Sequence, residues 1–311
     1  MKSQKLKGNL ILLLTSIIWG TSFIAQSKGV EEISAFAFNG VRSVLGGLVL
    51  IPLIAFRHSY NKKRKNHENT KTLLIGGLVC GCLLCAASTL QTAGMIYTSP
   101  GKSGFITALY MVIIPIIGLF TNKKPGIIIW VSVAFAIAGL YLMCIDSTLT
   151  INRGDVLTLI CAVIFSGHIL AIDYFAPKVD GVKLACLQFF VCGILNILCM
   201  LLFEEPDPRS ILSCWVSIGY SGIMSCGAAY TLQIIGQKYT DPASASILMS
   251  LESVFATLST VVLVACGWDL TGGALTVREI TGCALMFAAI ILVQLPEIRK
   301  SASDEVLPKK Q

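Results

Sequence analysis

Two stretches of the chain, residues 86–100 (AASTLQTAGMIYTSP) and residues 228–242 (AAYTLQIIGQKYTDP), are closely similar. Nine of the fifteen positions are identical at a constant offset of 228 − 86 = 142 residues. Nearer the N-terminus the offset becomes 154 − 8 = 146, which pairs Gly8 with Gly154. Agreement at a fixed spacing is the sequence signature of an internal repeat. The chain is therefore predicted to contain two copies of one unit.

The composition places both copies in a membrane. Hydrophobic residues make up 55% of the chain, charged residues 13%, and the mean hydropathy is +0.77. Soluble globular chains carry about 25% charged residues. The sequence therefore predicts a polytopic membrane protein in contact with the lipid bilayer, and the net charge of +7 is attributed to basic loops at the membrane surface and not to binding of nucleic acid.

Ten apolar runs approach the length of about 20 residues that a helix needs to cross the hydrocarbon core. The expected spans are residues 8–27, 33–56, 72–94, 100–121, 126–145, 154–175, 183–203, 211–237, 242–268 and 276–296. They divide into a first five-helix repeat at 8–145 and a second at 154–296, followed by a cytoplasmic tail at 297–311. The expected fold is thus all-α, with ten transmembrane helices in two repeats.

The basic residues indicate the orientation of these helices. With a cytoplasmic N-terminus, eighteen Lys and Arg residues fall on the inner side and five on the outer side. Because an excess of Lys and Arg marks cytoplasmic segments, both termini are predicted to be cytoplasmic in a multi-pass protein of the plasma membrane. Since five is an odd number, the second repeat must enter the membrane upside down. Secondary transporters with such inverted repeats bind substrate near the membrane midplane, between the two copies.

The duplicated stretch ends in the same helix-start signal in both copies, a small polar residue followed by Pro. Ser99 precedes Pro100, and Asp241 precedes Pro242. Ser and Asp are good N-cap residues, and Pro is favoured at the first helical position. Each pair therefore predicts a helix that restarts after a tight turn.

From residue 8 to residue 296, the chain resembles the EamA-type transporters of the drug/metabolite transporter superfamily. The stretches that carry the resemblance are residues 19–23 (WGTSF), 39–42 (NGVR), 97–100 (YTSP), 108–109, 239–240 and 250–256 (SLESVFA). Two positions depart from the family pattern: Ser253 replaces the usual Pro, and residues 266–268 read Cys-Gly-Trp in place of Leu-Gly-Glu. The resemblance implies a cavity enclosed by the first four helices of each repeat, with the fifth and tenth helices at the periphery. It also implies export of amino acids or related metabolites, or alternatively flipping of a lipid or polyprenyl carrier.

Two ionisable residues fall near the middle of predicted spans, Arg42 and Glu252. Intramembrane charges are expensive and usually mark a substrate or proton path. One interpretation is that Arg42 attracts a carboxylate or phosphate of the solute, while Glu252 pairs with an ammonium group or carries a proton. The alternative is that the two side chains neutralise each other across a helix contact.

Other polar and aromatic residues in the spans form a second group of candidates. The predicted cavity residues, with Arg42 and Glu252, are Trp19, Asn39, Gln91, Tyr110, Gln188 and Tyr230. His168 joins Glu252 as a candidate for proton coupling, although a hydrogen-bonded core His is an alternative. Gln91 and Gln233 occupy equivalent repeat positions, so an interhelical hydrogen bond explains them as well as solute contact does.

The sequence thus predicts a secondary transporter of a small-molecule solute that uses no cofactor and no metal. Residues 101–103 (GKS) resemble the end of a phosphate-binding loop, but position 96, where such a loop requires Gly, is Ile. An intramembrane enzyme is the alternative from another class, with Asp173 and Glu252 as its one plausible acid pair. The apolar helices leave room for a homodimer.

Overall fold

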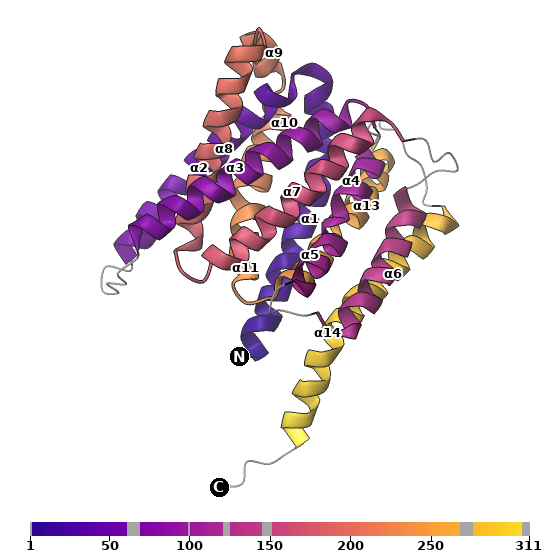
Figure 1. Ribbon diagram of the computed structural model, residues 1–311. Helices are drawn as coiled ribbons and strands as arrows, with labels where there is room; N and C mark the ends of the chain where they lie inside the picture. The colour runs from indigo at the N-terminus through magenta and orange to yellow at the C-terminus, as the bar shows by residue number, and fades with distance from the viewer. Residues whose placement is uncertain are drawn as a thin grey trace.

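The computed structural model describes residues 2–60, 69–98, 100–120, 125–144, 151–267 and 276–306, and within these ranges every regular element is a helix. The elements are α1 (Lys2–Glu32), α2 (Ala35–Tyr60), α3 (Thr70–Met95), α4 (Pro100–Ala108), α5 (Tyr110–Leu119), α6 (Ile127–Cys144), α7 (Arg153–Phe175), α8 (Gly181–Phe203), α9 (Pro208–Ser213), α10 (Trp215–Tyr220), the π-helix η1 (Ser221–Tyr230), α11 (Thr231–Gln237), α12 (Pro242–Met249), α13 (Glu252–Ala265) and α14 (Val277–Val306). Figure 1 shows them as one bundle of long, tilted helices.

Seven stretches of this bundle are long and apolar enough to cross a membrane. They are Gln4–Glu32, Ala35–Arg57, Thr70–Met95, Lys102–Leu119, Arg153–Phe175, Gly181–Phe203 and Pro242–Ala265. The other three predicted spans correspond to α6, whose apolar part Ile127–Leu142 is short, to the run from α9 to α11, which is divided among four elements, and to α14. The all-helical membrane fold is confirmed, and the count of ten inverted spans stays a prediction.

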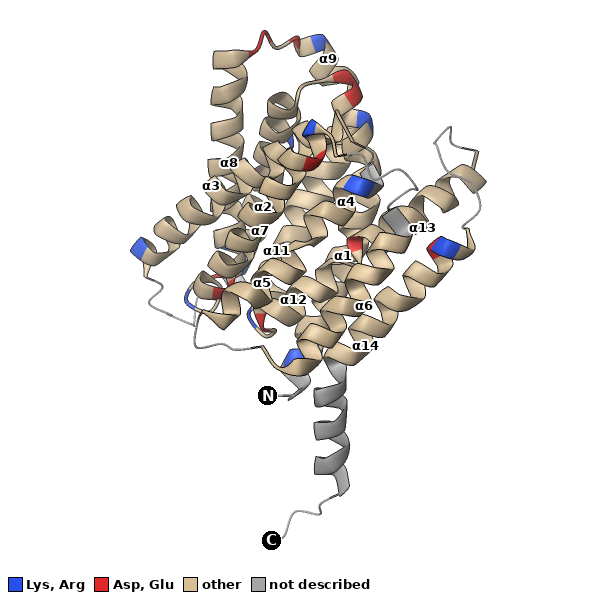
Figure 2. Ribbon diagram, turned by 45° about the vertical axis from the view of Figure 1, so that its right-hand side comes forward, with Lys and Arg blue, Asp and Glu red and all other residues tan. Residues whose placement is uncertain are grey.

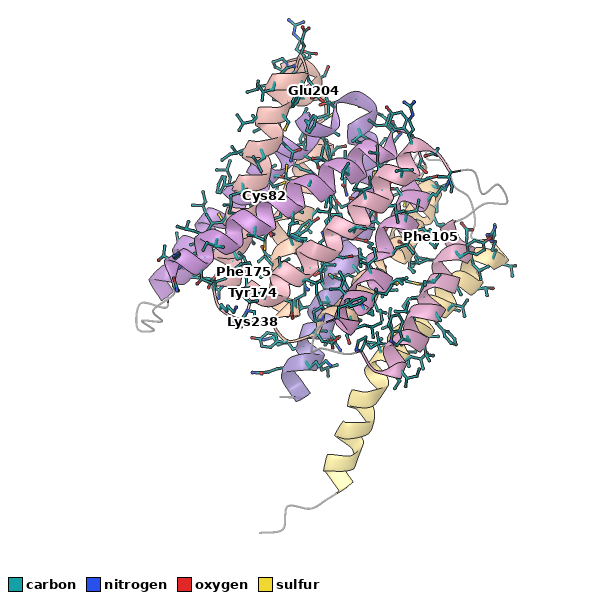
Figure 3. All side chains as sticks on the ribbon, viewed as in Figure 1. Cys82, Phe105, Tyr174, Phe175, Glu204 and Lys238 are labelled. Atoms are coloured by element: carbon teal, nitrogen blue, oxygen red, sulfur yellow. The ribbon has the colours of Figure 1, made fainter. Side chains whose placement is uncertain are left out.

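Charged residues gather at the two ends of the bundle, and its middle is almost free of them (Figure 2). The N-terminus lies at one end and α9 at the other (Figure 1). Figure 3 shows Glu204 at the α9 end and Lys238 at the N-terminal end. This separation is what burial in a bilayer requires, since charged side chains are costly in hydrocarbon.

Two of the predicted spans are broken at equivalent positions. Span 100–121 divides into α4 and α5 at Leu109, which has φ −60° and ψ −12°. Span 242–268 divides into α12 and α13 at Leu251, which has φ −59° and ψ −13°, and 251 − 109 = 142. At both breaks the amide of the Leu donates to the carbonyl three residues before it, at 3.2 Å from Leu109 and 3.4 Å from Leu251. Each break is thus one tightened turn, and Tyr110 and Glu252 become the first residues of the following helices.

The predicted restart at Asp241 and Pro242 is confirmed. The Asp241 carboxylate accepts a hydrogen bond of 2.9 Å from the backbone amide of Ser244, and Pro242 begins α12. This satisfies one of the orphan amides of the first turn. Ser99, the N-cap predicted for the other copy, lies outside the described residues.

Small residues bring the helices close together. On α3, a Cβ atom added to Gly81 would lie 2.5 Å from the Val191 Cβ atom and 2.8 Å from the Gln188 carbonyl oxygen of α8. In the same way, Gly139 of α6 approaches the Gly282 carbonyl oxygen of α14, 2.7 Å from its built Cβ atom. Membrane helices use such small residues to pack backbone against backbone. The α6 and α14 helices pack chiefly against each other at one side of the bundle (Figure 1).

Candidate functional site

A cavity of about 40 Å³ lies inside the bundle, where residues from both halves of the chain converge. Its lining residues come from α1, α2, α3, α4, α5, α7, η1, α11, α12 and α13. They are Trp19, Phe23, Gln26, Arg42, Gln91, Thr107, Tyr110, Phe165, Ile169, Ser225, Tyr230, Gln233, Met249 and Glu252. Six of these residues are among the eight that the sequence predicts for the cavity.

The acidic part of the wall is Glu252, whose side chain is buried. The Tyr110 hydroxyl donates a long hydrogen bond of 3.3 Å to Glu252 Oε1. This hydrogen bond holds the carboxyl group at the cavity.

The basic part of the wall is Arg42, which is also buried. Its guanidinium carbon lies 5.2 Å from the centre of the Phe38 ring, a cation–π contact. Its Nε has no hydrogen-bond partner, and no ion pair joins it to Glu252 or to any other carboxylate among the described residues. The charge neutralisation considered from the sequence is therefore not what this structure contains. A buried cation without a counter-ion is costly, so Arg42 is a group that an anionic ligand would stabilise.

Several uncharged polar groups in the cavity wall also lack a hydrogen-bond partner. Trp19 Nε1, Gln26 Oε1 and Gln233 Oε1 are buried and have no hydrogen-bond partner in the part of the chain that the structure describes. Together they offer one donor and two acceptors to the cavity. Buried polar groups in native proteins are nearly always paired with protein, water or ligand. Unpaired groups converging on one cavity therefore indicate a place that receives polar molecules.

An aromatic wall stands beside these polar groups. The rings of Trp19 and Tyr230 have centroids 4.7 Å apart at an interplanar angle of 62°. Phe189 supports Tyr230 from behind, with centroids 5.4 Å apart. Edge-to-face packing of this kind fixes the rings in place and gives the cavity an apolar face next to its two charged groups.

Three predicted site residues do not line the cavity. Asn39 joins α2 to α3 instead, donating to the Ser88 carbonyl oxygen at 3.3 Å and accepting from the Thr92 hydroxyl at 3.5 Å. Gln188 Oε1 lies 3.2 Å from His168 Nε2, in a hydrogen bond between α8 and α7. The His168 ring lies behind the wall, with its centroid 6.1 Å from that of Tyr230.

The structure also adds residues that sequence reasoning missed. Phe23 and Gln26 follow Trp19 by four and seven residues, which is the spacing of one helix face. That pattern was a usable signal. Ser225 lies in the π-helix η1, whose extra width per turn cannot be read from apolar periodicity. Gln91 donates to the Thr107 hydroxyl at 3.1 Å, so it both lines the cavity and joins α3 to α4.

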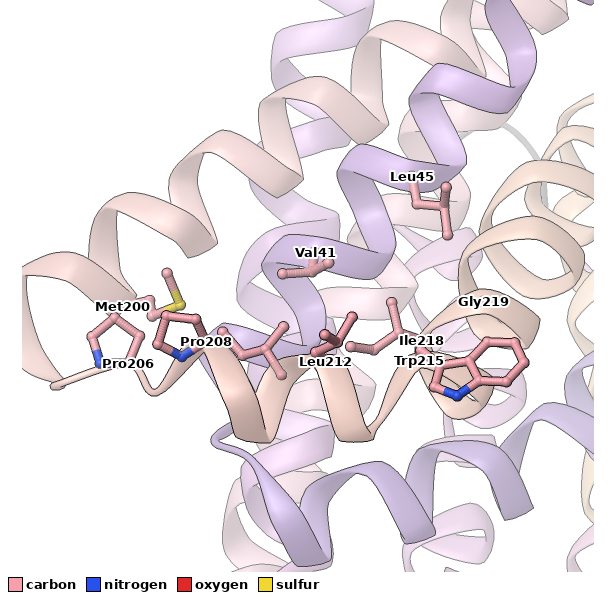
Figure 4. A pocket seen from close by; sticks show the side chains of 10 residues that line it. Val41, Leu45, Met200, Pro206, Pro208, Leu212, Trp215, Ile218 and Gly219 are labelled. Carbon is pink, nitrogen blue, oxygen red and sulfur yellow. The ribbon is translucent and has the colours of Figure 1, made fainter.

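A second, larger hollow of about 540 Å³ lies between α2, the end of α8, and α9 and α10. Figure 4 shows its walls, which include Val41, Leu45, Leu212 and Trp215. No charged side chain lines this hollow, and it shares no lining residue with the central cavity. It therefore offers apolar contact only.

Comparison with known proteins places these features in context. A family model described as the EamA-like transporter family matches residues 6–145 and again residues 152–295. An uncharacterized transporter of Archaeoglobus fulgidus is 29% identical over 94% of this chain and 87% of its own length. The uncharacterized inner membrane transporter YedA of Escherichia coli K12 is 24% identical over 94% of this chain and 92% of its own length. One solved crystal structure, 20% identical, has a TM-score of 0.72 over 94% of this chain and 98% of that one, so the two share a fold.

Proposed function

Because the chain belongs to the EamA-like transporter family, we propose that it is a secondary active transporter that moves small organic solutes across the cytoplasmic membrane by alternating access. Its solutes are amino acids or related metabolites, and the direction is export. The observation that carries this proposal is the central cavity, where a carboxyl group and a guanidinium whose Nε has no hydrogen-bond partner among the described residues line the same buried space.

The chemistry of the wall suits a zwitterion with an apolar side chain. The Arg42 guanidinium provides several N–H donors that match a carboxylate. Glu252 provides an acceptor for an ammonium group, and the Trp19–Tyr230 pair provides a flat apolar face. A solute with one charge of each sign would pair with both buried groups. Each pairing would offset the desolvation cost of burying that group without a counter-ion.

The size of the cavity indicates a closed conformation. Ligand sites usually enclose about 300–1,000 Å³, whereas this cavity measures about 40 Å³. An amino acid can enter only if the surrounding helices separate. Alternating access requires such separation, first toward one side of the membrane and then toward the other.

Transport of this kind draws on ion or solute gradients. Glu252 is the proposed proton carrier because it lines the cavity, where a bound solute and a proton can compete for one carboxyl group. His168 remains the second candidate, one layer behind the wall. We propose that both termini are cytoplasmic, following the distribution of Lys and Arg.

The test is counterflow in proteoliposomes. Vesicles are loaded with a mixture of unlabelled amino acids and metabolites, and the entry of each labelled compound is followed for the wild type, Glu252→Gln and the exposed control Glu205→Gln. We expect a few compounds to accumulate with the wild type and the control, and none with Glu252→Gln. If no soluble compound accumulated in vesicles that contain folded wild-type protein, the proposal would be overturned.

The structure gives less support to the two alternatives. A lipid flippase needs a polar path for the headgroup that opens to the bilayer, and the larger hollow in Figure 4 is apolar and separate from the polar cavity. An intramembrane enzyme needs converging reactive groups. Asp173, the proposed partner acid of Glu252, is not among the residues that line the cavity.

A further inference from the structure

Two small polar contacts lie at opposite ends of the bundle, one on each side of the central cavity. At the first, the end of α3 meets the start of α7. The Thr98 hydroxyl donates to Asp155 Oδ1 at 2.8 Å, and Lys102 Nζ lies 2.6 Å from Asp155 Oδ2. The helices approach closely here, since a Cβ atom on Gly154 would lie 2.5 Å from the Gly94 carbonyl oxygen.

The second contact joins the end of α11 to the start of α1. The Thr240 hydroxyl donates to Asn9 Oδ1 at 2.9 Å, and both residues are buried. The backbones again nearly touch, because a Cβ atom on Gly8 would lie 2.7 Å from Thr240 Oγ1 and 3.0 Å from the Gly236 carbonyl oxygen. An exposed ion pair between Lys5 and Asp241, 3.4 Å long, lies beside it.

The two contacts are the same contact made twice. The offset of 142 relates Thr98 to Thr240 and Gly94 to Gly236, and the offset of 146 relates Gly8 to Gly154 and Asn9 to Asp155. In each contact the third predicted span of one repeat meets the first span of the other. Opening either contact therefore separates the two repeats at that end of the bundle.

We propose that these clusters are the two gates of the transport cycle, the Thr98–Asp155–Lys102 cluster at one end and the Thr240–Asn9 cluster at the other. The proposal rests on the proposed function, and it adds residues that hold the helices in place without contacting the solute. Both gates are closed in this structure, which explains why the cavity between them is so small.

The gates differ in strength because one position differs in charge. Asp155 makes charge-assisted hydrogen bonds and an ion pair, and its side chain is only 6% exposed. Asn9 is neutral and makes one hydrogen bond to Thr240. The ion pair beside it, between Lys5 and Asp241, is longer at 3.4 Å, and its side chains are 33% and 45% exposed, so solvent screens it. Charge-assisted bonds are roughly twice as strong as neutral ones. The transporter at rest therefore opens more readily at the Asn9 end, which is the cytoplasmic end in the predicted topology.

The experiment uses substitutions that equalise or weaken the gates. Asp155→Asn gives the first gate the side chain that the second already has, and Asn9→Ala weakens the second. Glu205→Gln is the control that removes an exposed charge elsewhere. Hydrogen–deuterium exchange of backbone amides is followed by mass spectrometry in the full-length protein, at residues 94–98 and 151–158 for the first gate and residues 4–12 and 236–246 for the second.

We expect Asp155→Asn to raise amide exchange at its own gate at least several-fold and to lower it at the opposite gate. Asn9→Ala should do the reverse, and Glu205→Gln should change neither. A merely structural contact would loosen its own end and leave the other unchanged, and that result would overturn the proposal. Thr98→Val and Thr240→Val remove a single hydroxyl each and serve where a stronger substitution prevents folding.

The exchange measurement needs no solute, so it separates this proposal from the proposed function. Reciprocal changes in exchange with no counterflow of any soluble compound would support the gates and refute the solute class. Counterflow without opposite changes in amide exchange at the two gates would support the transporter and refute these gates.

Discussion

The Tyr110 hydroxyl donates a hydrogen bond to the Glu252 carboxylate across a distance of 3.3 Å, and the two residues are separated by 252 − 110 = 142 positions, the spacing of the sequence duplication. Equivalent positions of the two repeats therefore meet at the central cavity. Each begins the helix that follows a broken span. The repeats supply a similar backbone, and the two side chains make the site chemically unequal.

Replacing Tyr110 with Phe tests this contact. The change removes one hydroxyl and keeps the ring, so the loss should reflect a single hydrogen bond of about 0.5–1.5 kcal/mol, or roughly two- to tenfold in initial counterflow rate. Glu252→Gln should lose more, because it removes the charge itself. Tyr174→Phe, on the exposed side of α7, is the matched control and should behave as the wild type. A Tyr110→Phe protein with an unchanged rate would remove this hydrogen bond from the transport mechanism.

Substitution of Arg42 should separate solutes by their carboxylate. We expect Arg42→Gln to raise KM for amino acids by about tenfold or more, since hydrogen bonds to charged groups contribute about 1.5–3 kcal/mol. Methyl esters of the same compounds should be affected less. Arg42→Lys keeps the charge but lacks the planar guanidinium, so its KM for amino acids should lie between those of the wild type and Arg42→Gln. Equal effects on acids and esters would show that Arg42 acts only in packing, and Arg209→Gln at the exposed surface controls for loss of positive charge.

The two proton-coupling candidates can be distinguished by their positions. His168→Gln keeps a hydrogen-bonding group beside Gln188 but removes the imidazole ring. Because His168 lies behind the cavity wall, solute uptake driven by an imposed pH gradient should stay close to the wild-type rate. Glu252→Gln should abolish the response to the gradient. If His168→Gln abolished it and Glu252→Gln did not, the proton path would run through the contact between His168 and Gln188.

Close packing of α3 on α8 gives a prediction for stability. Gly81→Ala would place its Cβ atom 2.5 Å from the Val191 Cβ atom, so the helices must move apart, at a cost of about 1–3 kcal/mol in the free energy of unfolding. Gly219→Ala is the matched control, because nothing lies within 4 Å of its built Cβ atom and Ala favours a helix. Denaturation in mixed detergent micelles measures both. Equal stability of the two variants would show that the approach at Gly81 is looser than described.

The sequence predicted the long spans well because they depend on apolar length and on local caps. Expected span 154–175 became α7 (Arg153–Phe175), and span 183–203 became α8 (Gly181–Phe203). Their starts are fixed by the side chains of Asn152 and Asp180, which accept backbone hydrogen bonds. Signals of this kind lie within a few residues of the boundary that they determine.

The breaks at Leu109 and Leu251 could not be predicted in the same way. Neither site contains Gly or Pro: the sequence reads Ala-Leu-Tyr at one and Ser-Leu-Glu at the other. The tightened turns therefore depend on packing against other helices, which no local pattern records. The π-helix that divides the run 211–237 is hidden for the same reason.

The charged residues of the candidate site could be predicted from the sequence, whereas its uncharged polar residues could be predicted only in part. Arg42 and Glu252 are visible because charges within a span are costly and rare. Uncharged polar residues are common in spans and serve both cavities and helix contacts. Gln26 and Ser225 line the cavity while Asn39 and Gln188 join helices, and only the three-dimensional arrangement distinguishes these two uses.

The side position of α6 and α14 has a consequence for how such a chain can diversify. They pack on each other, and the cavity takes none of its lining residues from them. Substitutions on their outer faces therefore leave the lining of the cavity unchanged. The cavity lining and the α6–α14 pair are thus separate parts of the fold, so evolution, or a protein engineer, can modify one while the other is kept.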